Sequence, residues 1–160
     1  MRKLHPLRLV VVAALVGSAE LAVALPSGIA AAKKGPLTAT CTGLFGGASQ
    51  QVLTGCTSGS SKVTANGLSV VTITGATSGT STVYWQSGKT TIESFSYVLT
   101  PGPGSCPTFE GTTANDVVTE NVTVTGGNAK LTVGQTGTGT SCVYTSGGSI
   151  YEQGLGSTSF

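Results

Sequence analysis

The chain has 160 residues, a formal net charge of +2 and only 9% charged residues. Its one histidine, His5, and its only arginines, Arg2 and Arg8, all lie at the start of the chain. The remainder therefore has no imidazole base for Ser-His-Asp or Cys-His hydrolysis and no histidine for a zinc or iron site. Its only adjacent cations are Lys33 and Lys34, whereas nucleic-acid binding needs clustered ones. We predict no nucleic-acid partner, no metal and no cofactor.

Residues 1–32 have the pattern of an export signal. A basic start precedes the apolar run "LVVVAALVGSAELAVAL", and three alanines precede Lys33. We predict cleavage before Lys33 and a secreted, extracellular protein that is free or associated with the cell envelope. The alternative is an uncleaved membrane anchor, which Glu20 and Pro26 within the apolar run disfavour. A lipid anchor at Cys41 is disfavoured because the residue before it is neither Gly nor Ala.

Residues 33–160 are predicted to form a single domain with no net charge. Gly, Ser and Thr make up half of this region, so its large apolar side chains suffice for one thin core. Its lysines and acids balance each other: Lys33, Lys34, Lys62, Lys89 and Lys130 against Glu93, Glu110, Asp116, Glu120 and Glu152.

Four cysteines lie in the exported region, which indicates two disulfide bonds in an oxidising compartment. Three pairings are possible. We favour Cys41 with Cys56 and Cys106 with Cys142, because pairing between nearest neighbours suits a chain of hairpins. Loop-closure entropy assigns these bonds about 3 and about 4 kcal/mol of stability.

The region reads as all-β, because Val, Thr and Ile dominate and apolar residues do not recur at helical spacing. Alternation with a period of two is clear where Phe95, Tyr97 and Leu99 are separated by Ser96 and Val98. We predict one antiparallel β-sandwich, with a partly closed β-barrel as the alternative. The main predicted strands are 69–75, 81–87, 90–100, 117–126, 129–134 and 141–146, with shorter ones around Cys41, "QQVLTGC", "SIYE" and "STSF".

Two segments between the strands draw attention. Residues 101–116, "PGPGSCPTFEGTTAND", contain three prolines, which forbid a central strand, and we expect a loop pinned by Cys106. The Gly-Lys-Thr of "YWQSGKTT" lacks the first glycine of a phosphate-binding loop, since Val83 occupies that position. We predict instead a tight hairpin, with Gly88 accepting a positive φ.

No catalytic residue is assigned. The one enzyme class left open is a two-carboxylate hydrolase, for which Glu110, Asp116 and Glu120 are the nearest acids in sequence. No pattern places two of them around a cleft, and none of the acids forms a calcium-binding loop.

Tyr84, Trp85 and Tyr97 are the candidate ligand-binding residues, as an aromatic platform for a sugar ring. Neighbouring residues of a strand point to opposite faces, so we expect Trp85 in the core and Tyr84 exposed. An ordinary cross-strand aromatic cluster is the alternative interpretation.

The order of short motifs resembles that of small exported all-β proteins of actinobacteria. These motifs are "CTG", "LTGC", "VYWQSGKTT", "CPTFEG", "VTVTGG", "SCVYT" and "GLGSTSF". The resemblance covers nearly all of the exported region and implies no activity and no binding residue.

We predict a non-enzymatic structural or interaction domain of the secreted fraction or the cell envelope. Its partner would be a cell-wall glycan or another extracellular protein. The alternatives are a carbohydrate-binding module for cell-wall or environmental glycan and a carrier of a small apolar ligand.

Overall fold

Residues 35–160 are the part of the chain described by the computed structural model, and all of their regular structure is β. The predicted signal, residues 1–32, lies outside them. No helix of the length and apolar character of a membrane span occurs among the described residues. The strands are β1 (Ala39–Cys41), β2 (Gly43–Gly46), β3 (Gln50–Thr54), β4 (Thr57–Ser58), β5 (Asn66–Gly75), β6 (Ser78–Trp85), β7 (Thr90–Pro101), β8 (Asp116–Gly127), β9 (Thr136–Ser146), β10 (Ser149–Gly154) and β11 (Thr158–Ser159).

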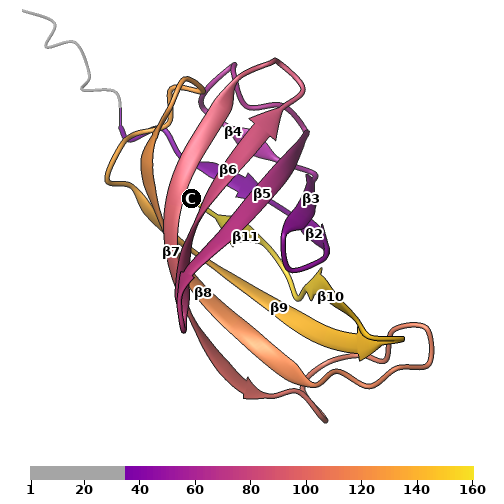
Figure 1. Ribbon diagram of the computed structural model, residues 1–160. Helices are drawn as coiled ribbons and strands as arrows, with labels where there is room; N and C mark the ends of the chain where they lie inside the picture. The colour runs from indigo at the N-terminus through magenta and orange to yellow at the C-terminus, as the bar shows by residue number, and fades with distance from the viewer. Residues whose placement is uncertain (1–34) are drawn as a thin grey trace, which may run out of the picture. The chain divides into compact units, whose positions relative to one another are not determined.

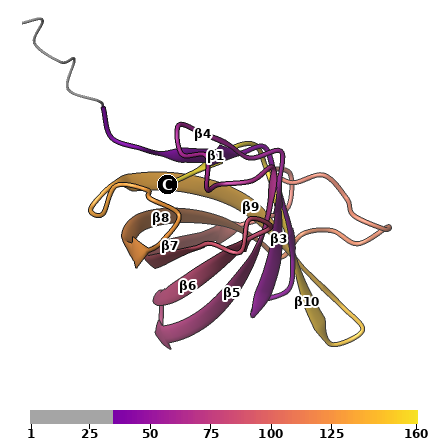
Figure 2. The same ribbon diagram turned by 90° about the horizontal axis from the view of Figure 1, so that it is seen from above.

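Eight of these strands form a closed antiparallel barrel in the order β10-β2-β3-β5-β6-β7-β8-β9 (Figure 1). Seen from above, β8, β7, β6, β5 and β3 follow one another around the wall (Figure 2). The ring closes because β10 pairs with β9 on one side and, through Glu152 with Gly46 and Gln153 with Phe45, with β2 on the other. The predicted sandwich is therefore wrong, and the alternative barrel is the better description.

Side-chain alternation places one face of each long strand inside the barrel. Phe95 on β7 and Val122 and Val124 on β8 are buried, as the period of two predicts. With Trp85 and Val83 of β6 they belong to one apolar core.

One predicted strand, 129–134, is a loop between β8 and β9. Lys130 has a φ of 63° and Gly134 a φ of 85°, so the backbone leaves the extended region at two points. The backbone N–H of Thr132 donates to the carbonyl of Leu37 at 3.0 Å, and Ala129 is buried against the core. Ala129 and the partly buried Leu131 anchor this loop to the core, whereas Val133 is exposed.

A small three-stranded sheet, β11-β1-β4, covers one end of the barrel core. Ala39 and Phe160 exchange backbone hydrogen bonds of 2.6 and 3.0 Å. The ring of Phe160 lies 6.1 Å from that of Trp85, and Phe160 is only 2% exposed. Phe160 therefore closes this end of the barrel from within.

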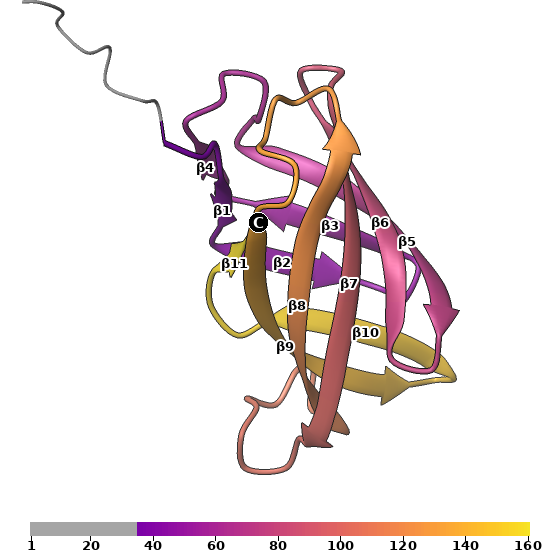
Figure 3. The ribbon, with the colours of Figure 1, turned by 90° about the vertical axis from the view of Figure 1, so that its left-hand side faces the viewer.

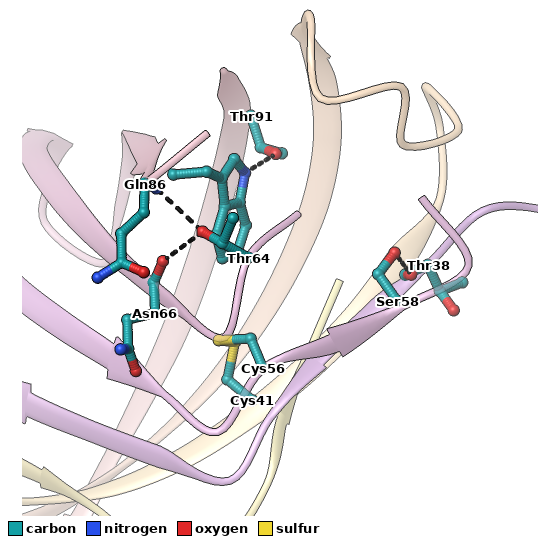
Figure 4. The surroundings of a disulfide bond; sticks show 9 residues. Thr38, Cys41, Cys56, Ser58, Thr64, Asn66, Gln86 and Thr91 are labelled. Carbon is teal, nitrogen blue, oxygen red and sulfur yellow. Dashed lines mark hydrogen bonds between the residues drawn. A yellow bond between two sulfur atoms is a disulfide. The ribbon is translucent and has the colours of Figure 1, made fainter. Parts of the chain in front are cut away.

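The Cys41–Cys56 disulfide joins β1 to the residue before β4, as predicted. Figure 4 shows its surroundings, where Thr64 holds the following loop against the β6–β7 hairpin. The Thr64 hydroxyl accepts from the N–H of Gln86 and donates to the carbonyl of Asn66, both at 2.9 Å. The covered end of the barrel is thus fixed by both covalent and hydrogen bonds.

The segment between β7 and β8 projects from the end opposite β1 and β4 (Figure 3). The predicted Cys106–Cys142 disulfide pins it to the outer face of β9. Phe109 lies 5.7 Å from the ring of Tyr144, whose hydroxyl donates to the carbonyl of Pro107 at 2.8 Å. This second cluster buries Tyr144 outside the barrel and confirms the expected disulfide-pinned loop.

The β6–β7 connection is the predicted hairpin. Trp85 N–H donates to the Lys89 carbonyl at 2.8 Å, and Gly88 N–H donates to the Trp85 carbonyl at 2.9 Å. Gly88 has a φ of 71°, which a residue with a Cβ rarely adopts.

Candidate functional site

A cavity of about 360 Å³ occupies the interior of the barrel. Val83, Phe95 and Phe160 line its deep end, where all three side chains are buried. At its other end Ile73, on β5, and Leu99, on β7, are about half exposed, at 52% and 51%. The cavity therefore opens to solvent through an apolar mouth on the side away from the small sheet.

Apolar side chains make up most of the cavity wall. They come from all eight barrel strands, together with Ala48 of the β2–β3 connection and Phe160. The residues are Leu44, Ala48, Leu53, Val71, Ile73, Val83, Phe95, Tyr97, Leu99, Val118, Val122, Val143, Ile150 and Phe160.

Glu93, on β7, is the most deeply buried acid of this wall, with 4% of its surface exposed. Ser81, opposite it on β6, donates a hydrogen bond to its Oε2 at 2.9 Å. Among residues 35–160, Oε1 of Glu93 is the buried side-chain atom for which no hydrogen-bond partner exists. Burial raises the pKa of Glu93 to about 8. The hydrogen bond from Ser81 lowers this pKa but offsets only part of the effect of burial, and the nearby charge of Glu120 raises it further.

Two further acids lie along the same wall. Burial, with the charge of Glu152 adding to it, raises the pKa of Glu120 on β8 to about 7. Burial also raises the pKa of Glu152 on β10, although hydrogen bonds from Ser141 and Gln51 stabilise its charged form. The Gln51 amide donates to Oε2 at 2.6 Å and the Ser141 hydroxyl donates to Oε1. Glu152 thus has partners within the protein for both oxygens.

The charges in the cavity are of one sign. Glu93, Glu120, Glu152 and, near the mouth, Asp116 line it, and no lysine, arginine or histidine of the described region does. Within residues 35–160 no group of acids, cysteines or histidines is arranged to hold a metal ion. The available chemistry is therefore to pair with a cation, to exchange hydrogen bonds with a ligand, or to take up and release a proton.

The sequence analysis did not single out Glu93 or Glu152. Strand parity is the signal that finds Glu93, since it shares the inward face of β7 with Phe95, Tyr97 and Leu99. Glu120 shares the inward face of β8 with Val122 in the same way. An acidic residue at a strand position where the alternation predicts an apolar, inward-facing side chain therefore indicates a buried acid.

Two of the three acids considered for two-carboxylate chemistry line the same cavity, and the third lies outside it. Asp116 and Glu120 both line the cavity. Glu110 is exposed in the β7–β8 segment, at a φ of 49°.

The three aromatic candidates are divided between two surfaces. Tyr97 lines the inner cavity, and its hydroxyl donates to the Ala76 carbonyl at 3.1 Å. Tyr84 is exposed on the outer face, as expected, while Trp85 is buried and donates through Nε1 to Thr91 Oγ1 at 2.9 Å. Tyr84 and Trp85 both border a shallow outer depression of about 260 Å³.

No protein-family model, curated protein or solved structure significantly matches this chain. The resemblance to small exported actinobacterial proteins stays a prediction, and the function is inferred from the chemistry of the cavity.

Proposed function

We propose that the protein binds a small, mainly apolar molecule inside the barrel and thereby acts as a carrier. The observation that supports this most directly is the cavity, which opens at an apolar mouth and ends on Phe160. Its volume lies within the range of about 300–1,000 Å³ that is usual for small-molecule sites. Polar groups set among mainly apolar walls are also typical of such sites. Of the three hypotheses from the sequence, this one has the most support.

The exposed side chains at the mouth support the same proposal. Ile73, Leu99 and Ile150 leave about half of their surface in water at the point where the cavity opens. Exposed apolar groups grouped around an opening mark a binding site more often than isolated ones do. A ligand that passes them would cover apolar surface, which stabilises the complex by roughly 25 cal/mol per Å².

A neutral fluorophore with solvent-sensitive emission, prodan, tests the proposal. We expect the protein to bind prodan and shift its emission to the blue. Leu99→Trp, at the mouth, and Val118→Trp, on the cavity wall, should weaken binding at least fivefold. Val98→Trp is the matched control, because Val98 is the outward neighbour of Leu99 and is 60% exposed.

Circular dichroism and thermal unfolding establish that each variant is folded before its binding is compared. Absence of prodan binding to the folded wild-type protein would contradict the proposal. Equal binding by the Leu99→Trp, Val118→Trp and Val98→Trp proteins would contradict it as well, because the fluorophore would then be bound outside the barrel.

The outer face supports a second candidate function, the binding of a sugar ring. Phe45, Val52, Leu68 and Tyr84 are each paired with the next across β2, β3, β5 and β6, and each is 40% exposed or more. They form an apolar row that ends at the depression beside Tyr84. Amphipathic aromatic rings at such positions stack on the apolar face of a ligand.

Retention on insoluble cell-wall glycan tests this second candidate. We expect Tyr84→Ala to lose retention, whereas Tyr151→Ala, an exposed tyrosine of β10, should keep it. The absence of retention in the wild-type protein would remove the candidate.

A further inference from the structure

We infer that the molecule held in the barrel carries a basic nitrogen, which binds as an ammonium group to Glu93. This inference rests on the proposed function and names the chemical class of its ligand. It depends on three features of the cavity: an acceptor atom without a partner, the sign of the charges, and the order of the inward side chains along β7.

The open acceptor is Oε1 of Glu93. Ser81 occupies Oε2, and no described residue donates to Oε1, although the side chain is 96% buried. An unpaired buried oxygen of this kind costs about 1–3 kcal/mol, more when it is charged. In the ionised carboxylate both oxygens are acceptors, so a donor from a ligand would remove that cost. Glu152, by contrast, already receives hydrogen bonds from Gln51 and Ser141.

The sign of the charges selects the kind of donor. Glu93 on β7 shares the cavity with Glu120 on β8, Glu152 on β10 and, near the mouth, Asp116, and the charge of Glu120 acts on Glu93. No basic residue of the described region lines the cavity. An anionic ligand would add a further negative charge to this set. An ammonium donates a charge-assisted hydrogen bond, which is about twice as strong as a neutral one.

The order of the inward side chains along β7 sets the orientation of the ligand. Glu93, Phe95, Tyr97 and Leu99 follow one another on the inward face of β7, from the interior to the half-exposed mouth. When the ammonium group binds Glu93, the rest of the ligand therefore lies along Phe95 and Tyr97. The ligand class is an amphipathic amine that enters with its nitrogen first.

Binding of such an amine should release a proton. Glu93, with a pKa of about 8, is mostly protonated at pH 7. An alkyl ammonium with a pKa near that of lysine, about 10.4, keeps its own proton. In this step the carboxylic acid of Glu93 and the ammonium group of the ligand form a carboxylate–ammonium pair and release one proton. No other bond changes. The neighbouring positive charge lowers the pKa of Glu93 in the complex.

Three probes with the same eight-carbon chain test the inference: octylamine, 1-octanol and octanoate. Each competes with prodan at pH 7, and calorimetry in two buffers of different ionisation enthalpy counts the protons released. We expect octylamine to bind at least tenfold more tightly than 1-octanol, with octanoate weakest, and to release about one proton.

Glu93→Gln is the decisive variant, and Glu110→Gln is its matched control because Glu110 is exposed outside the cavity. Glu93→Gln should lose the preference for octylamine over 1-octanol, together with the proton release. Glu110→Gln should keep both.

The possible failures of the two proposals are distinct. If prodan binds but octylamine binds no better than 1-octanol, the amine inference is wrong and the carrier proposal stands. An amine preference that survives in Glu93→Gln would also overturn the inference. If the folded protein binds neither prodan nor any octyl probe, both are wrong.

Discussion

Ser81 and Glu93 lie opposite each other on β6 and β7, and the serine hydroxyl donates to one carboxyl oxygen at 2.9 Å. One neutral hydrogen bond offsets little of the cost of burying a charge. The neighbouring Glu120 opposes ionisation further. The burial of this pair therefore makes the stability of the protein depend on pH.

Raising the pH from 5 to 9 should destabilise the unliganded protein. The pKa of Glu93 is raised to about 8 in the folded state from an ordinary value of 4.5. Between these values the folded protein holds a proton that the unfolded chain has lost. The free energy of unfolding then falls with pH, by up to about 1.4 kcal/mol per pH unit for one group.

Urea unfolding followed by circular dichroism at several pH values measures this slope. Glu93→Gln should make this slope shallower and should be more stable than the wild type at pH 9, while the raised pKa values of Glu120 and Glu152 keep part of the slope. Glu110→Gln should leave the slope unchanged. A wild-type protein whose stability rises over this window would contradict the assignment.

Phe160→Ala should cost about 3–5 kcal/mol of stability, because it removes a buried ring that packs against Trp85. Phe45→Ala is the control, since Phe45 is 44% exposed, and its cost should be about 1 kcal/mol. Chemical denaturation gives both values. Similar losses in the two proteins would show that Phe160 does not close the barrel.

Thr91→Val should leave the indole N–H of Trp85 buried without an acceptor. The expected cost is about 1–3 kcal/mol, the penalty of an unsatisfied buried donor. Thr119→Val on the exposed face of β8 should change stability by less than about 0.5 kcal/mol. Thermal unfolding compares them, and an unchanged midpoint for Thr91→Val would be the contrary result.

Removal of the Cys106–Cys142 bond by substitution of both cysteines with alanine should cost about 4 kcal/mol, since the bond spans 36 residues. The corresponding double variant of Cys41 and Cys56, which spans 15 residues, should lose about 3 kcal/mol.

Hydrogen exchange distinguishes the two disulfide variants by the segments in which the amides lose protection. Without Cys106–Cys142, amides of segment 102–115 should exchange faster while those of β5 to β7 stay protected. Uniform loss of protection would show that this bond supports the whole barrel.

Local patterns in the sequence predicted much of this structure. The alternation of Phe95, Tyr97 and Leu99 indicated the inward face of β7, and the turn at Gly88 indicated the β6–β7 hairpin. The two disulfide pairings followed from nearest-neighbour connectivity. The alternation and the turn depend on residues close in the chain, and each disulfide joins cysteines that are consecutive in the sequence, so a single sequence contains the signal.

The closure of the barrel and the cavity were decided by tertiary structure. Glu152 on β10 is paired with Gly46 on β2, more than a hundred positions earlier, and no local pattern links two such short strands. The gathering of Glu93, Glu120 and Glu152 depends on the same closure. Parity along a strand determines which side chains share a face. Whether that face lies against a second sheet or around an enclosed space depends on how the twisted edge strands meet, and that is a property of the whole chain.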